Sequence, residues 1–215
     1  MPDIPSDLVL LVDGFAAQPA VAAVVVAGSV GAETTDAHSD YDLYVYADGE
    51  VPVAARRALA EKLGRNRREI DNRFWEPGDE WALAASGRVV DIMYRSPAWI
   101  EGRLAALLER HEPALGYTTC FWDNVLHSRI LFDRTGWFAA LQEKARVPYP
   151  EELAAAIIRH NLPLLRGSIS SYRTQLLKAA KRGDPVSGNH RAAALLASYF
   201  DILYPANRVT HPGEK

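Results

Sequence analysis

The apolar residues of the first hundred positions follow two different periods. Residues 21–27 are Val and Ala with no polar residue, which is typical of a strand covered on both faces. Residues 41–46 are rich in aromatic and β-branched residues, which favours a second strand. Apolar residues at helical spacing predict helices at 4–17, 52–65 and 97–110. Helix-like and strand-like segments therefore alternate in this region.

The same region contains the patterns of further strands. Residues 68–75 and 88–94 predict two strands separated by a Pro-Gly-Asp turn and a glycine. A short helix is predicted at 121–127 and a short edge strand at 128–132. Together these elements predict a small mixed sheet flanked by helices.

The last seventy residues differ, because they read almost entirely as helix. A break at Pro148 and Pro150 precedes this part, and we place a domain boundary there, between residues 1–147 and 148–215. The predicted helices are at about 151–166, 168–182 and 188–204. The predicted fold class is α+β, with the mixed sheet followed by a helical bundle as C-terminal domain.

Composition excludes several classes of protein. The 215 residues are 48% hydrophobic and 24% charged, ordinary values for a globular chain and unlike those of a disordered or fibrous one. The net charge of −3 gives no strong signal for a nucleic-acid partner. Cys120 is the single cysteine, which fits a reducing compartment. With no basic signal peptide and no apolar stretch long enough for a membrane span, we expect a soluble, cytoplasmic protein.

Small residues and acids frame the polar loop after the first buried strand. The strand ends at Gly28-Ser29, ten residues follow, and the next strand opens with Asp40-Tyr41-Asp42. Strand side chains alternate, so Asp40 and Asp42 are expected on one face, roughly 7 Å apart. Gly28 lets a phosphate approach the backbone, and Ser29 offers a hydroxyl and an N–H group to phosphate oxygens.

A third acid lies in a later apolar strand. Asp91 is flanked by Val90 and Ile92, and an aspartate in such a setting is rare unless it meets a charge. If the two strands are neighbours, Asp91 joins the first two aspartates. An alternative interpretation pairs Asp91 with Arg88 or Arg95 at a sheet edge.

Three such carboxylates predict a divalent-cation site. Mg²⁺ prefers oxygen ligands and usually binds one or two carboxylates together with substrate phosphates. Two ions held by Asp40, Asp42 and Asp91 would act on both the attacking and the leaving oxygen of an in-line phosphoryl transfer. The acids Glu76, Asp79 and Glu80 are interpreted as ordinary loop residues, although they would suit a cationic acceptor.

The glycine, serine and three aspartates together resemble the signature of the DNA polymerase beta-like nucleotidyltransferase superfamily. Residues 39–43, Ser-Asp-Tyr-Asp-Leu, match its common Ser-Asp-x-Asp-Leu motif, and the resemblance covers residues 21–94. The length and the helical C-terminus are most similar to minimal and antibiotic-modifying members, such as aminoglycoside and lincosamide adenylyltransferases. One departure is in the loop, where Ala32 and Glu33 stand in place of the family's Arg and Gly.

The resemblance implies an activity and roles. The reaction would transfer a nucleoside monophosphate, most simply AMP from ATP, to a hydroxyl of an acceptor, with a small molecule such as an aminoglycoside favoured over a protein. Gly28 and Ser29 would hold phosphates, Asp40 and Asp42 would bind both Mg²⁺ ions, and Asp91 would bind the catalytic ion and is a candidate general base. The alternatives are an antitoxin-type nucleotidyltransferase that binds or modifies a partner protein, and a nucleotide-binding protein without turnover.

The end of the chain carries a weaker resemblance. Asn207-Arg208 and the segment 211–215, His-Pro-Gly-Glu-Lys, are similar to the Asn…Pro-Gly-x-Lys segment of a C-terminal domain found in some of these proteins. Such relatives usually continue beyond this lysine. We therefore expect the C-terminal domain to be incomplete.

Overall fold

The computed structural model describes residues 6–27, 40–74 and 76–213. The chain forms two compact units, each made of two segments. The first unit consists of Met1–Glu101 and Asn124–Ala145, and the second of Gly102–Asp123 and Arg146–Lys215. The chain passes from the first unit into the second within helix α4 (Pro97–Leu108) and returns within helix α5 (Cys120–His127).

A six-stranded sheet forms the centre of the first unit. Its strand order is β3-β4-β5-β2-β1-β6. Strands β2 and β5 are parallel, and the other neighbours are antiparallel, so the sheet is mixed. The strands are β1 (Val21–Val26), β2 (Tyr41–Ala47), β3 (Gly64–Asn72), β4 (Gly78–Leu83), β5 (Val89–Arg95) and β6 (Arg129–Asp133). The predicted α+β class is confirmed, and β6 is the edge strand expected at this point of the chain.

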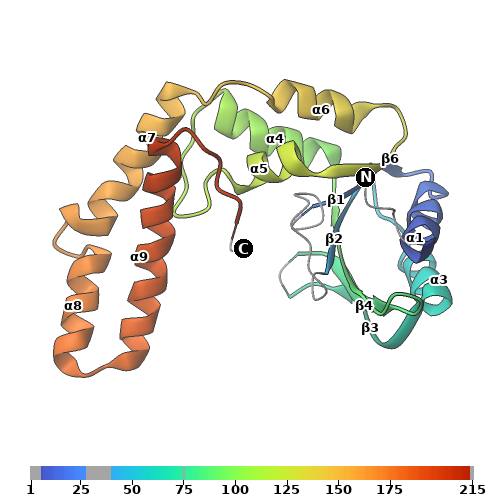
Figure 1. Ribbon diagram of the computed structural model, residues 1–215, viewed down its shortest axis with the longest axis horizontal. Helices are drawn as coiled ribbons and strands as arrows, with labels where there is room; N and C mark the ends of the chain where they lie inside the picture. Colours follow the sequence, from blue (N-terminus) through green and yellow to red (C-terminus); the bar gives the residue numbers. More distant parts are fainter. Residues whose placement is uncertain (1–5, 28–39, 75, 214–215) are drawn as a thin grey trace. The chain divides into compact units, whose positions relative to one another are not determined.

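Helices α1 (Ser6–Ala16) and α3 (Val53–Leu63) lie on one face of this sheet (Figure 1). Every second residue of β2, beginning with Tyr41 and Leu43, is buried against this layer, as are Val90 and Ile92 of β5. Helix α3 ends at Leu63, and the chain continues directly into β3 at Gly64. The alternation of strand side chains leaves the other residues of β2 and β5 for the opposite face.

The opposite face contacts helix α6 (Trp137–Ala145) near the end of β2. The ring of Tyr46 lies 5.4 Å from the rings of both Trp137 and Phe138. The indole N–H of Trp137 donates a 2.7 Å hydrogen bond to Glu101. This aromatic packing covers the carboxyl end of β2, whereas Asp40 at the other end is exposed.

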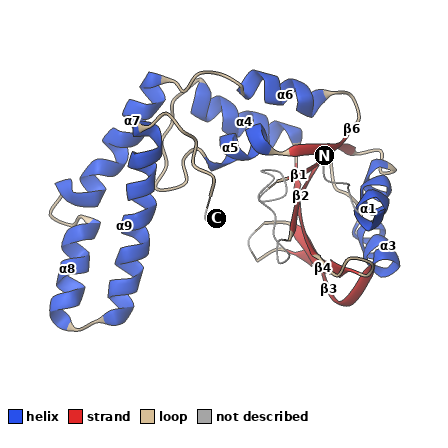
Figure 2. Ribbon diagram, viewed as in Figure 1, coloured by secondary structure: helices blue, strands red, loops and turns tan. Residues whose placement is uncertain are grey.

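The second unit is helical (Figure 2). It contains α7 (Glu151–Leu162), a π-helical turn η1 (Pro163–Gly167), α8 (Tyr172–Arg182) and α9 (Pro185–Ala206), and α8 packs beside α9. Ser171 caps α8 by accepting a hydrogen bond from the backbone N–H of Thr174, and Gly183 ends it in the left-handed conformation. No helix in the described ranges is long and apolar enough to cross a membrane.

Three elements differ from the expectation of the sequence pattern. Residues 78–83 form strand β4 although Asp79 and Glu80 give them the polar character of a turn. Residues 137–145 form α6, where the pattern predicts no element. The strand predicted at 68–75 begins earlier, at Gly64, because the preceding helix ends at Leu63.

Candidate active site

Asp42 and Asp91 lie at the same register of two neighbouring parallel strands, β2 and β5. Residues paired in this way point to the same face of a sheet, and adjacent strands are roughly 4.8 Å apart. Asp42 is half-buried and Asp91 is exposed, while Tyr41 and Val90 beside them are buried in the core on the other face. The sequence prediction that these strands are neighbours is confirmed.

Of the remaining predicted site residues, the structure describes Asp40. Asp40 directly precedes β2, two positions before Asp42, and it is exposed. Gly28 and Ser29 lie outside the described residues, so their predicted contact with phosphate stays a prediction. The sheet-edge position of the alternative interpretation is wrong, because β5 is an inner strand between β4 and β2. The pairing of Asp91 with Arg88 or Arg95 stays a hypothesis.

Two further acids extend the pair across the sheet. Glu80 of β4 is paired with Asp91 of β5, and Glu69 of β3 is paired with Glu80. Glu80 is exposed, and Glu69 forms an ion pair with Arg67 of its own strand. We call Glu69, Glu80, Asp91 and Asp42 the carboxylate row. It crosses four adjacent strands, and the sequence pattern did not reveal it because residues 76–80 looked like a turn.

The carboxylate row favours a cation. Like charges directly opposite each other on neighbouring strands destabilise a sheet, and a bound cation reverses this effect. No group of three or more His, Cys, Asp or Glu side chains within the described part of the chain is arranged to hold a metal ion. The donor set is nevertheless of the right kind, since Asp42 and Asp91 supply the one or two carboxylates with which Mg²⁺ is usually bound.

A buried ionic network fixes β4 and β5 from the other side of the sheet. Asp79, the neighbour of Glu80, is only 1% exposed. It accepts a 3.0 Å hydrogen bond from the guanidinium of Arg56 on α3 and a 2.7 Å hydrogen bond from the hydroxyl of Tyr94 on β5. These contacts tie α3, β4 and β5 together directly beneath the carboxylate row.

The pKa values within this network follow from burial and charge. Burial lowers the pKa of the Arg56 guanidinium, but the charge of Asp79 and the other partners outweigh it, so the pKa is raised. Burial, assisted by the negative charge of Asp79, raises the pKa of the Tyr94 hydroxyl. The network therefore consists of a charged arginine, its carboxylate partner and a neutral tyrosine that donates its proton.

Arg95 shapes the exposed face further along β5. Its guanidinium lies 4.0 Å from the centre of the Trp99 ring and 5.7 Å from that of Tyr44, and it forms a 3.1 Å ion pair with Glu76. The side chain is only 6% exposed. Arg95 and Tyr44 thus form an aromatic and cationic wall beyond the carboxylate row.

The first unit is thus an α+β domain with a carboxylate row on one face of its sheet. No protein-family model matches the chain. No curated protein matches it either. Among solved structures, the chain is similar to a nucleotidyltransferase-like protein from Exiguobacterium sibiricum 255-15, with 12% sequence identity and a TM-score of 0.42. The match covers 92% of this chain and spans 56% of that protein.

Proposed function

We propose that this protein is a metal-dependent nucleotidyltransferase that transfers a nucleoside monophosphate, most simply AMP from ATP, to a hydroxyl of an acceptor. The observation that supports this proposal is the shared register of Asp42 and Asp91 on one face of the sheet, with Asp40 two positions before Asp42. Acids from two distant segments that meet on an open face suit the binding of metal and triphosphate together.

The proposed step is a single displacement at phosphorus. The acceptor oxygen forms a bond to the α-phosphorus while the bond from this phosphorus to the bridging oxygen of the β-phosphate breaks, and pyrophosphate leaves with the electron pair of that bond. The proton of the hydroxyl passes to a carboxylate, for which Asp91 is the candidate. An exposed carboxylate beside the acceptor can accept the proton without being desolvated first.

Different residues of the chain would have different roles in this transfer. Asp40, Asp42 and Asp91 would hold the magnesium ions, and Gly28 and Ser29 would hold the phosphates. Bound Mg²⁺ supplies positive charge for the phosphate oxygens and favours deprotonation of the hydroxyl. The network of Asp79, Arg56 and Tyr94 would keep β4 and β5 in register, so that Asp91 stays aligned with its neighbours.

The acceptor proposed is a cationic small molecule, of which an aminoglycoside is an example. Glu80 and Glu69 continue the row on the side of Asp91 away from Asp42. Their charge would attract ammonium groups of an acceptor whose hydroxyl lies near Asp91. A protein acceptor would have to present a comparable cationic surface.

The test is transfer of label from ATP labelled at the α-phosphate. The protein is incubated with labelled ATP and Mg²⁺ across a panel of aminoglycosides and lincosamides, with and without a chelator. We expect label on a small molecule only when Mg²⁺ is free in solution and no chelator is present. We expect this labelling to be lost in the variants Asp42→Asn and Asp91→Asn. Asp48→Asn is the matched control, since Asp48 is exposed at the end of β2, away from the row.

The outcomes separate the alternatives. Label on a co-purified protein instead of a small molecule indicates the antitoxin-type function, with the same transfer chemistry. Nucleotide binding without any transfer indicates a binding protein. Transfer that is equally fast in the wild type and in both aspartate variants contradicts the assignment of the site.

A further inference from the structure

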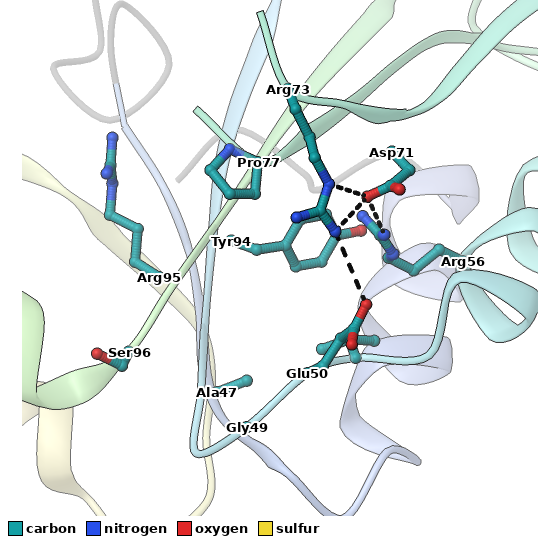
Figure 3. Close-up of a pocket in the computed structure, with 11 residues that line it drawn as sticks. Ala47, Gly49, Glu50, Arg56, Asp71, Arg73, Pro77, Tyr94, Arg95 and Ser96 are labelled. Carbon is teal, nitrogen blue, oxygen red and sulfur yellow. Dashed lines mark hydrogen bonds and ion pairs between the residues drawn. The ribbon is translucent and has the colours of Figure 1, made fainter. Parts of the chain in front are cut away.

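The first unit contains a cavity of about 370 Å³ at the carboxyl ends of β2 and β5 (Figure 3). Its apolar wall includes Val51, Pro77 and the ring of Tyr94. Its charged groups come from the loop after β2, from α3, from the end of β3 and from Arg95 at the end of β5. The cavity thus combines an apolar wall with charged side chains from four different parts of the chain, as small-molecule sites do.

This cavity is separate from the carboxylate row. Asp91 lies near the start of β5, and the cavity lies at its end, roughly 13 Å further along the strand. Tyr94, which forms the wall, also points to the opposite face from Asp91, since three positions separate them. The cavity is therefore not part of the proposed transferase site, and binding of a ligand in it does not depend on that function.

Arg56 is the fixed positive charge of the cavity. Its side chain is only 4% exposed and forms ion pairs with Asp79 at 3.0 Å and with Asp71 at 3.1 Å. Its guanidinium also lies 4.5 Å from the centre of the Tyr94 ring. Because Arg56 is held by these partners, it cannot turn to meet a ligand without breaking a buried ion pair.

Arg73 is the movable positive charge. Its guanidinium reaches into the cavity toward two carboxylates, that of Asp71 at 3.0 Å and that of Glu50 at 4.0 Å (Figure 3). The side chain of Arg73 is 63% exposed and that of Glu50 is 70% exposed. Exposed ion pairs of this kind contribute little to stability, so Arg73 can leave the cavity at small cost.

We propose that this cavity binds a small organic cation, an ammonium or guanidinium group on a short apolar body, in the place that the Arg73 guanidinium occupies. When Arg73 turns outward, the carboxylates of Glu50 and Asp71 remain in the lining, with Asp79 behind them on Arg56. The other lining guanidinium, that of Arg95, is paired at 3.1 Å with Glu76. An anion in the same place would meet a surplus of negative charge. The apolar wall of Val51, Pro77 and Tyr94 accommodates the body of the ligand.

The probe is agmatine, which carries both a guanidinium and an ammonium group. The full chain is titrated with agmatine, and binding is measured by calorimetry and by NMR. We expect saturable binding with a Kd of about 1 mM or below. Arg73→Gln removes the internal competitor and is expected to tighten binding. Glu50→Gln removes one ion-paired carboxylate and is expected to weaken binding roughly tenfold. Glu61→Gln on α3, an exposed acid that does not line the cavity, is expected to leave the affinity unchanged.

Three results would overturn the proposal. The first is no saturation by agmatine in either the wild type or Arg73→Gln. The second is an affinity that Glu50→Gln and Glu61→Gln change equally, which would show general attraction to an acidic surface. The third is tight binding of inorganic phosphate that is lost in Arg73→Gln, which would make the cavity an anion site. Because Glu50, Glu61 and Arg73 are exposed, all three variants are expected to fold, and circular dichroism verifies this.

Discussion

Asp42 and Asp91 occupy the same register on neighbouring parallel strands, although 49 positions separate them along the chain. The chain between them forms α3 and the hairpin of β3 and β4, and then returns to place β5 beside β2. This path puts Glu80 on the far side of Asp91. One connection therefore builds both the aspartate pair and the acidic surface next to it.

The aspartate pair predicts a specific response of stability to Mg²⁺. Mg²⁺ that binds the native state and not the unfolded chain stabilises the native state, by about 1.4 kcal/mol when the free Mg²⁺ concentration is ten times the Kd. We expect the wild-type free energy of unfolding, measured by urea denaturation, to rise with Mg²⁺, and that of Asp91→Asn to stay constant. In metal-free buffer, Asp91→Asn relieves the repulsion from its neighbours and is expected to gain up to about 1 kcal/mol. A wild-type stability that does not respond to Mg²⁺ would contradict the site.

Glu80 predicts a difference between acceptors. If it attracts a cationic acceptor, Glu80→Gln raises KM for that acceptor roughly tenfold and leaves kcat unchanged, since the interaction is made equally before and during the transfer. An acceptor without positive charge is expected to show no change in KM. Steady-state kinetics with one acceptor of each kind measure this. A fall of kcat for both would instead place Glu80 among the groups that act on the reacting atoms.

Much of the fold follows from short-range patterns in the sequence. The apolar run at 21–27 indicates correctly a strand that is covered on both faces, and the aromatic and β-branched residues at 41–46 indicate correctly the second strand. The aspartates at Asp40, Asp42 and Asp91 are visible because acids are rare between apolar strand residues. Their meeting depends on strand order, which no local pattern contains, and only the resemblance of the motif suggested it.

The parts that sequence did not predict depend on partners far along the chain. Asp79 looks like a loop acid, yet it lies buried in β4 because Arg56 and Tyr94 neutralise and bind it. If that pairing is not known, the charges of residues 79 and 80 favour a turn more strongly than Trp81 and Leu83 favour a strand. The carboxylate row was missed for the same reason, since it runs through β4 and its neighbours.

The buried network predicts a large loss of stability for one substitution. Asp79→Asn leaves the guanidinium of Arg56 buried without its main charge partner, and removing one partner of such a pair costs about 3–5 kcal/mol. Tyr94→Phe removes a single hydrogen bond to the same carboxylate and is expected to cost about 1.5–3 kcal/mol. Urea denaturation of both variants compares them. Equal and small losses would show that Arg56 is solvated and that the network does not fix β4 and β5.

A buried acid in the second unit predicts how stability depends on pH. Asp201 of α9 is 2% exposed and accepts a 3.0 Å hydrogen bond from the backbone N–H of Thr118. Burial raises the pKa of its carboxyl above the ordinary value of 3.8, and the hydrogen bonds from Thr118 offset this only in part. The folded state therefore holds the proton more tightly than the unfolded chain, and protonation of Asp201 stabilises the fold.

The raised pKa of Asp201 sets the sign of the effect. The stabilisation by this proton is fully present below the unfolded pKa and is lost as the pH rises through the folded pKa. Asp201→Asn cannot ionise, so the free energy of unfolding of the wild type minus that of Asp201→Asn should fall as the pH rises from about 4 and then become constant.

Glu151 supplies the opposite case within the same unit. The hydrogen bond from Arg208 lowers the pKa of its carboxyl, so its contribution is present above the unfolded pKa and is lost as the pH falls through the folded pKa. The free energy of unfolding of the wild type minus that of Glu151→Gln should therefore rise with pH over the acidic range. Urea denaturation at a series of pH values measures both differences. If the two variants gave the same slope, the pH dependence would come from the overall charge of the chain, and the surroundings of Asp201 and Glu151 would not be its cause.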